Sequence, residues 1–182
     1  KRLRDNENVH TIFVDPKQQV TMGLSKKEIC TTPTQVLECM MRKQKNIVFY
    51  PRVESKYIGN DLNRVVDHVF AVNKKEGFRR IRRVVAIDEV QSFVRKGISD
   101  GLDKLYLIGA GVGITGVCMT QRLQNMNETV WSQSENKVIF RIDEILSYLK
   151  SRNLQHYIDE LPFYLDEMNQ YWYYATTGNG RW

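Results

Sequence analysis

The chain has 182 residues, 42% of them hydrophobic and 26% charged, which are the proportions of an ordinary globular protein and exclude a disordered or fibrous one. Its net charge of +6 is compatible with a polyanionic partner. We expect a single domain over residues 1–182. No apolar run approaches the ~20 residues that cross a bilayer, and no signal peptide is visible, so we expect a soluble, intracellular protein.

The three cysteines and three histidines are scattered along the chain. Their spacing fits neither a disulfide framework nor a set of metal ligands, so we expect no zinc or haem site. Ordinary structural or surface roles are expected for all six. These residues are Cys30, Cys39, Cys118, His10, His68 and His156.

Short apolar runs of the kind that forms buried strands alternate with helical segments through most of the chain. The predicted strands are 9–14, 47–50, 84–88, 114–120, 138–142 and 171–176. The predicted helices are 33–42, 61–75, 92–107 and 143–157, and the segment 18–31 is predicted to be irregular. Strands that alternate with helices need crossover connections, which indicates an α/β fold with a mainly parallel sheet flanked by helices.

The first two predicted helices carry clear local signals. Thr32 is a good N-cap for the first, with Pro33 at its first position and Gln35 where a capping box needs it. In the second, apolar residues at i, i+3, i+4, i+7 and i+8 from Leu62 form one stripe.

Two predicted strands end in polar residues that suit phosphate chemistry. One ends in Asp88 and Glu89, and the next ends in Thr120-Gln121-Arg122. Parallel strands finish at the same edge of a sheet, where α/β proteins place their sites. An Asp there can hold Mg²⁺, a Glu can polarise an attacking water, a Gln can bind a γ-phosphate, and an Arg can neutralise phosphate charge. The alternative is a strand that runs into a solvated polar loop.

In the order of these parts the chain resembles the FtsK/HerA group of P-loop ATPases, which includes DNA translocases and viral genome-packaging motors. Residues 84–89 match the Walker B strand, and the segment from Gly113-Ile114 to residue 122 is similar to the group's glycine–isoleucine, strand, Thr-Gln-Arg segment. Residues 11–17 resemble a strand that ends in Asp-Pro-Lys, and residues 138–142 resemble the strand that follows residue 122. The short length and the aromatic final strand look more like a viral packaging ATPase than a long cellular translocase.

The resemblance implies a three-layer P-loop NTPase-like fold and an ATP-driven translocase of double-stranded DNA that works as a ring, a pentamer or a hexamer. It implies ATP and Mg²⁺ as ligands: Asp88 holds Mg²⁺, Glu89 activates water, Gln121 senses the γ-phosphate, and Arg122 is a further catalytic group. Capsid or membrane proteins are further candidate partners, and a small-molecule metabolite substrate is not expected. The implied location is the virion vertex or the host cytoplasm.

Two departures from the group's pattern stand out. The sequence contains no Gly-x-x-x-x-Gly-Lys-Ser/Thr, and we expect that phosphate loop, with the strand before it, to precede Lys1. The group often carries an Arg before the glycine–isoleucine pair that reaches the neighbouring subunit, and here that place holds Ala110. Candidates for a trans-acting cation are Arg122, Arg95 and Lys104. Candidates for contact with DNA or a neighbouring subunit are Arg95, Lys96 and Lys104.

The densest basic run is 74–83, which enters the strand at 84 from its N-terminal end and therefore lies on the sheet edge opposite Asp88 and Glu89. It is either a solvated helix end or a contact for DNA, anionic lipid or a capsid protein.

Two other functions stay open. Gly111, Gly113 and Gly116 have the Gly-x-Gly-x-x-Gly spacing of a Rossmann dinucleotide site, in which a strand precedes the glycines and a helix follows them. The other alternative is a non-catalytic DNA-binding or structural subunit of the P-loop fold.

Overall fold

The structure is a computed structural model that describes residues 9–20, 28–52, 54–76, 81–93, 100–121, 126–140 and 173–177. The chain divides into two compact units, residues 1–121 with 125–131 and residues 122–124 with 132–182. The expectation of a single domain stays a prediction.

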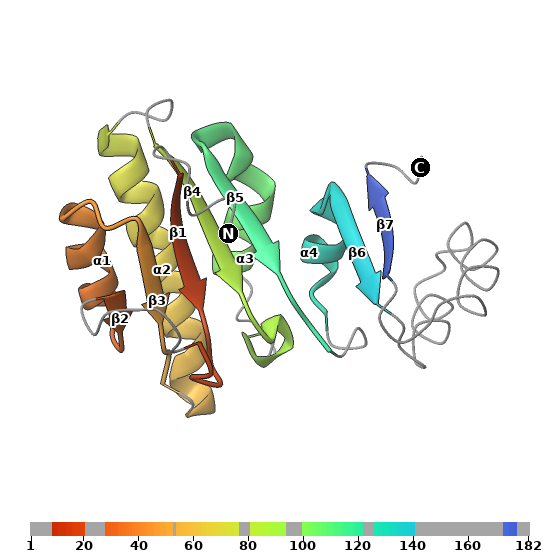
Figure 1. Ribbon diagram of the computed structural model, residues 1–182, viewed down its shortest axis with the longest axis horizontal. Coiled ribbons are helices and arrows are strands. Elements are labelled where there is room, and N and C mark those ends of the chain that lie inside the picture. The colour runs from red at the N-terminus through yellow and green to blue at the C-terminus, as the bar shows by residue number, and fades with distance from the viewer. Residues whose placement is uncertain are drawn as a thin grey trace. The chain divides into compact units, whose positions relative to one another are not determined.

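The first unit is built on a five-stranded sheet with the strand order β2-β3-β1-β4-β5 (Figure 1). Every pairing in it is parallel. The strands are β1 (Val9–Val14), β2 (Ile29–Cys30), β3 (Asn46–Phe49), β4 (Arg82–Ile87) and β5 (Ile114–Cys118). The predicted α/β class with a mainly parallel sheet flanked by helices is confirmed.

Three helices form a layer over one face of this sheet (Figure 1). They are α1 (Pro33–Met41), α2 (Ser55–Glu76) and α3 (Asp100–Ile108), with α2 packed between the other two. Two 3₁₀ turns, η2 (Val90–Phe93) and η3 (Ala110–Val112), follow β4 and α3. The capping box at Thr32 is formed as predicted, because its side chain accepts the Gln35 N–H and the Gln35 side chain accepts the Thr32 N–H.

The core lies between this helix layer and the sheet. Alternate residues of β1 and β4, such as Ile12, Val14 and Val85, are at most 1% exposed and belong to it. On the opposite face of the sheet, Phe13 is half-buried and Val117 is 40% exposed. In the described residues, the sheet face that carries the helices is therefore the more deeply buried of the two faces.

Several boundaries differ from the prediction. Helix α2 begins at Ser55 rather than at residue 61, because Ile58 lies four residues before Leu62 and extends the buried stripe by one turn. Strand β2 was not predicted, since two residues are too few to show a period. The predicted helix 92–107 is η2 and α3, and residues 94–99 between them lie outside the described part.

The Rossmann alternative is wrong. Leu105 to Ile108 belong to a helix rather than to a strand, and the glycine turn leads into β5 rather than into a helix. Gly113 has φ 74°, the left-handed conformation that glycine adopts without strain, and it lets the chain turn from η3 into β5.

In the second unit β6 (Asn136–Phe140) pairs with β7 (Tyr173–Thr177) in an antiparallel ribbon. The strand predicted at 138–142 is thus present two residues earlier, and the aromatic strand is confirmed. A short helix, α4 (Glu128–Gln133), was not predicted, and its residues up to Trp131 belong to the first unit. The predicted helix 143–157 lies outside the described residues. No helix in the described ranges is long and apolar enough to cross a membrane.

A close approach between α2 and α3 depends on Gly101. Its N–H donates to Asn63 Oδ1 over 2.9 Å. A Cβ at Gly101 would lie 2.5 Å from that oxygen and 3.0 Å from the Asn63 Cα, so the Asn63 side chain would have to leave its hydrogen bond and the backbone beside it would have to shift slightly. In contrast, a Cβ at Gly111 would meet no atom within 4 Å.

We predict that Gly101→Ala destabilises the protein by about 1–3 kcal/mol, because the two helices must separate to admit the methyl group. Gly111→Ala is the control and should change the free energy of unfolding by less than about 0.5 kcal/mol. Urea denaturation of both variants measures this. Equal stability of the two variants would show that α3 is not docked on α2 as described.

Candidate functional site

The parallel strands of the first unit bring their C-terminal ends to one edge of the sheet. Backbone hydrogen bonds continue past the strands there and tie the following residues together. The Asp88 N–H donates to the Val14 carbonyl over 3.0 Å, and the Met119 N–H donates to the Ile87 carbonyl over 2.9 Å. The residues after β1, β4 and β5 therefore form one connected cluster, as the sequence predicted for the ends of β4 and β5.

Glu89 adopts an unusual backbone conformation in this cluster. Its φ is 47°, in the left-handed region that costs a residue with a side chain roughly 1 kcal/mol or more. The conformation is held on both sides, because the Val90 N–H donates to the Met119 carbonyl (3.0 Å) and the Ser92 N–H donates to the Glu89 carbonyl (2.8 Å). Glu89 is 5% exposed, so its carboxylate is turned into the fold rather than into solvent.

Both oxygens of the Glu89 carboxylate have donors. Lys17 Nζ forms an ion pair with Oε1, and the Gln91 side-chain amide donates to Oε2. The Lys17 side chain is 40% exposed and the Glu89 side chain 7% exposed. A nearly buried carboxylate is thus neutralised by a cation that still reaches water.

The turn after β1 places Lys17. The Asp15 carboxylate is fully buried and accepts the backbone N–H groups of Lys17, Gln19 and Val20 over 2.7–3.0 Å. An Asp that caps its own turn in this way fixes the backbone that follows it. Asp15 is therefore a structural residue that holds the base of the Lys17 side chain beside Glu89.

Gln91 connects Glu89 to the end of β5. Its Nε2 donates to Glu89, and its Oε1 accepts the Thr120 hydroxyl over 2.6 Å. The three side chains come from the turn after β4, from η2 and from the residues after β5. They form a continuous hydrogen-bonded chain across two strand ends.

Asp88 differs from its acidic neighbours. It is half-buried, and its carboxylate makes no hydrogen bond or ion pair with the described residues. In the part of the chain that the structure describes, no group of three His, Cys, Asp or Glu side chains could hold a metal ion. An Mg²⁺ ion fits such a site when one carboxylate binds it and phosphate oxygens and water supply the remaining ligands.

The other predicted site residues fall in different places. Gln121 is exposed and lies directly after Thr120, at the predicted edge. Lys104 lies on α3, where its Nζ pairs with Asp67 Oδ1 at 2.6 Å and lies over the Phe70 ring. The predicted residues Arg95, Lys96 and Arg122 lie outside the described ranges.

The sequence did not point to the roles of Lys17, Gln91 and Thr120 in this cluster. Lys17 and Thr120 follow strands that were predicted correctly, so the rule that parallel strands end at one edge would have placed them near Glu89. Gln91 carries no such signal, because its position depends on the left-handed turn at Glu89.

The ion pair with Glu89 raises the pKa of Lys17 above its ordinary value of 10.5, mainly through the hydrogen bond between the two side chains. A raised lysine pKa means that the stabilisation from the pair is fully present below 10.5 and is lost as the pH rises through the raised value. The pair is therefore intact at neutral pH.

We predict that Glu89→Gln lowers the pKa of Lys17 toward 10.5, because the neutral amide no longer favours the charged ammonium. NMR titration of the Lys17 side chain measures it. Glu38→Gln is the control, since Glu38 pairs weakly with Arg42 at 3.9 Å and should leave Lys17 unchanged. An unaltered Lys17 pKa in Glu89→Gln would mean that the ion pair does not exist in solution.

No protein-family model and no curated protein sequence matches the chain. Several solved structures are similar to it. The genome packaging NTPase B204 from Sulfolobus turreted icosahedral virus 2, in complex with AMPPCP, is similar with a TM-score of 0.69 and 16% identity over 94% of this chain and 79% of that one. Its AMP complex gives 0.70 and 15% over 94% and 78%.

The DNA-packaging ATPase B204 from Sulfolobus turreted icosahedral virus gives a TM-score of 0.63 and 17% identity over 94% of this chain and 78% of that one. Identities this low establish the fold alone. The resemblance inferred from the sequence is confirmed at that level: the chain has the α/β, P-loop NTPase-like fold of these viral packaging NTPases.

Proposed function

We propose that this chain is an ATPase that drives double-stranded DNA translocation, as the motor subunit of a viral genome-packaging machine. The observation that carries the proposal is the pair Asp88 and Glu89 at the C-terminal edge of the parallel sheet, with Glu89 held in a strained turn by its neighbours. The names of the similar structures, a packaging NTPase solved with nucleotide analogues and a DNA-packaging ATPase, support it.

The two carboxylates have different proposed roles because their surroundings differ. Asp88 is unpaired among the described residues and would hold Mg²⁺, which neutralises phosphate charge when ATP is bound. Glu89 would accept the proton of the attacking water. Each carboxylate oxygen accepts one donor here and keeps a second lone pair for the proton, and Lys17, the donor that reaches solvent, is the one that can move aside for the water.

The remaining assignments extend this proposal to the assembly. Gln121 would sense the γ-phosphate and Arg122 would neutralise transferred charge. A ring of five or six copies would place a neighbouring subunit beside each nucleotide and enclose DNA. The virion vertex or the host cytoplasm, with capsid or membrane proteins as partners, suits such a machine.

A non-catalytic DNA-binding subunit of the same fold is the second candidate. The observation that favours it is the lack of a Gly-x-x-x-x-Gly-Lys-Ser/Thr loop in residues 1–182. The two candidates differ in whether the intact protein, with any segment that precedes Lys1, binds and turns over ATP.

We predict that Glu89→Gln lowers the ATP turnover of the intact protein by about 10²–10⁴-fold, because the general base is lost. Binding of ATP, measured with a fluorescent analogue, should survive because Glu89 is not needed to hold the nucleotide. Glu38→Gln, an exposed carboxylate on α1, is the control and should keep full turnover. Undiminished hydrolysis in Glu89→Gln removes Glu89 from the mechanism, and no nucleotide binding by the wild-type protein favours the non-catalytic candidate.

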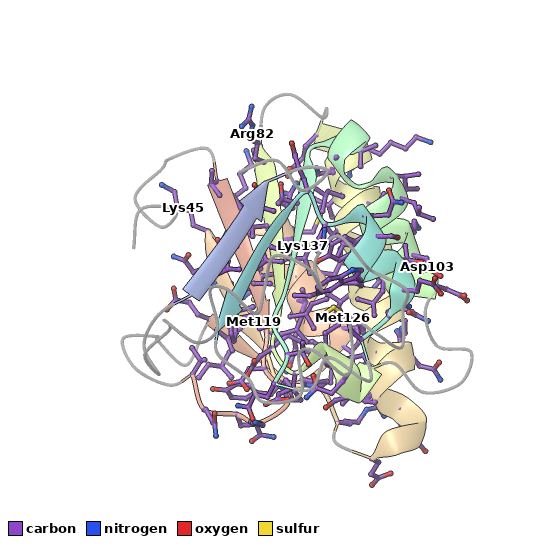
Figure 2. All side chains as sticks on the ribbon, turned by 90° about the vertical axis from the view of Figure 1, so that its right-hand side faces the viewer. Lys45, Arg82, Asp103, Met119, Met126 and Lys137 are labelled. Carbon is purple, nitrogen blue, oxygen red and sulfur yellow. The ribbon has the colours of Figure 1, made fainter. Side chains whose placement is uncertain are left out.

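The other edge of the sheet, where the strands begin, supports the proposed DNA partner. Exposed cations gather there from the turn after α1, from the end of α2 and from the start of β4. Figure 2 shows two of them, Lys45 and Arg82, toward the end of the sheet opposite Met119. We call these six residues the basic edge: Arg42, Lys43, Lys45, Lys74, Lys75 and Arg82.

The fold neutralises the acidic groups beside the basic edge and leaves the cations exposed. Arg83, 1% exposed, turns inward and pairs with Glu76 at 2.6 Å. Glu38 pairs with Arg42. Lysine and arginine side chains of this kind contact phosphates without regard to sequence, which suits a motor.

A lipid surface suits the basic edge less well than DNA. Membrane-surface helices keep a large apolar face to insert. The apolar faces of α1 and α2 are buried in the core instead, with Val36, Val65 and Val69 fully buried.

We predict that replacing Lys74, Lys75 and Arg82 together by Glu weakens binding of a short DNA duplex by at least about tenfold near physiological salt and flattens its salt dependence. Fluorescence anisotropy measures both. Arg64→Glu, at an exposed arginine midway along α2, is the control and should have little effect. Unchanged duplex binding, with lost binding to anionic vesicles, would assign the basic edge to lipid.

A further inference from the structure

We infer that Thr120 and Gln91 are positioning residues that orient the Glu89 carboxylate and make that orientation depend on the place of the end of β5. The inference rests on the proposed function, because it concerns the group assigned as general base. It adds two residues to the site and a route by which Gln121, next to Thr120, can influence the base.

The direction of each hydrogen bond follows from the chemistry of the three groups. An ionised carboxylate only accepts, so the Gln91 amide must present its NH₂ group to Glu89. The Gln91 oxygen then faces Thr120, whose hydroxyl must donate to it over 2.6 Å. If the amide were reversed, its oxygen would face the carboxylate and repel it. The Thr120 hydroxyl therefore fixes which end of Gln91 meets Glu89.

We call the hydrogen-bonded series Thr120, Gln91 and Glu89 the relay. Backbone hydrogen bonds hold the residues at both ends of the relay close to each other. Met119, the residue before Thr120, donates its N–H to Ile87 and accepts the N–H of Val90. These bonds lie on either side of Asp88 and Glu89. The distance between Thr120 and Gln91 thus stays fixed as long as the end of β5 stays paired with the turn after β4. A displacement at Thr120 would change the amide orientation and with it the carboxylate.

Lys17 cannot supply this orientation. Its ammonium is a point charge on a flexible chain and forms an ion pair from many directions, whereas a planar amide held at both ends fixes an angle. The Lys17 side chain is also 40% exposed, so water can replace it at Oε1. Lys17 compensates the charge of Glu89, and Gln91 with Thr120 sets its geometry.

The test compares Thr120→Val, which keeps the shape and removes the hydroxyl, with Thr120→Ser, which keeps the hydroxyl. We expect Thr120→Val to lower the kcat of ATP hydrolysis by about tenfold or more with KM within about twofold, and Thr120→Ser to restore most of it. Gln91→Leu should resemble Thr120→Val, and the double variant should be no worse than either single one. Wild-type kcat in Thr120→Val, or independent losses that multiply in the double variant, would overturn the relay.

A second measurement does not depend on hydrolysis. The side-chain NH₂ signals of Gln91 in a ¹H–¹⁵N spectrum should shift in Thr120→Val and in Glu89→Gln and stay near their wild-type positions in Thr120→Ser. Unshifted signals in Thr120→Val overturn the relay even in an inactive protein. If Thr120→Val shifts these signals but the wild-type protein does not hydrolyse ATP, the relay is supported and the proposed function is contradicted instead.

Discussion

The nearly buried carboxylate of Glu89 is the group on which this edge of the structure depends. An uncompensated charge at such a depth costs several kcal/mol, so the fold has to bring donors to it. Lys17 comes from the turn after β1 and Gln91 from η2, and Thr120 after β5 holds Gln91 in turn. Satisfying one charge thus connects the ends of three neighbouring strands.

The surrounding backbone gives these contacts their precision. The Asp15 carboxylate accepts three N–H groups of its own turn and thereby fixes the position of Lys17. The left-handed turn at Glu89 points the carboxylate inward at a conformational cost, and the turn is held by the Val90 N–H, which donates to Met119, and by the Ser92 N–H, which donates to Glu89. Backbone strain of this kind persists only where the surrounding structure holds it in place.

The fold and the place of the site follow from patterns that a sequence displays. Apolar runs of four to six residues predict β1, β3 and β4 within two residues, and the acids after β4 mark the edge where a parallel sheet carries chemistry. The contacts of Gln91 cannot be predicted in this way, since they depend on a positive φ at Glu89 that no local pattern of glutamate indicates. Arg83 is a similar case. It lies within a run of basic residues, and only the structure shows that it turns inward to pair with Glu76.

The two edges of one sheet therefore have opposite chemistry for a common structural reason. Parallel strands gather all their C-terminal turns at one edge and all their starts at the other. At the first edge the acids Asp15 and Glu89 are buried and compensated from within. At the second edge the buried Arg83 is compensated from within by Glu76, whereas the described cations of the basic edge are exposed to solvent. Under the proposed function, this separation would keep the DNA-binding cations away from the nucleotide-binding edge.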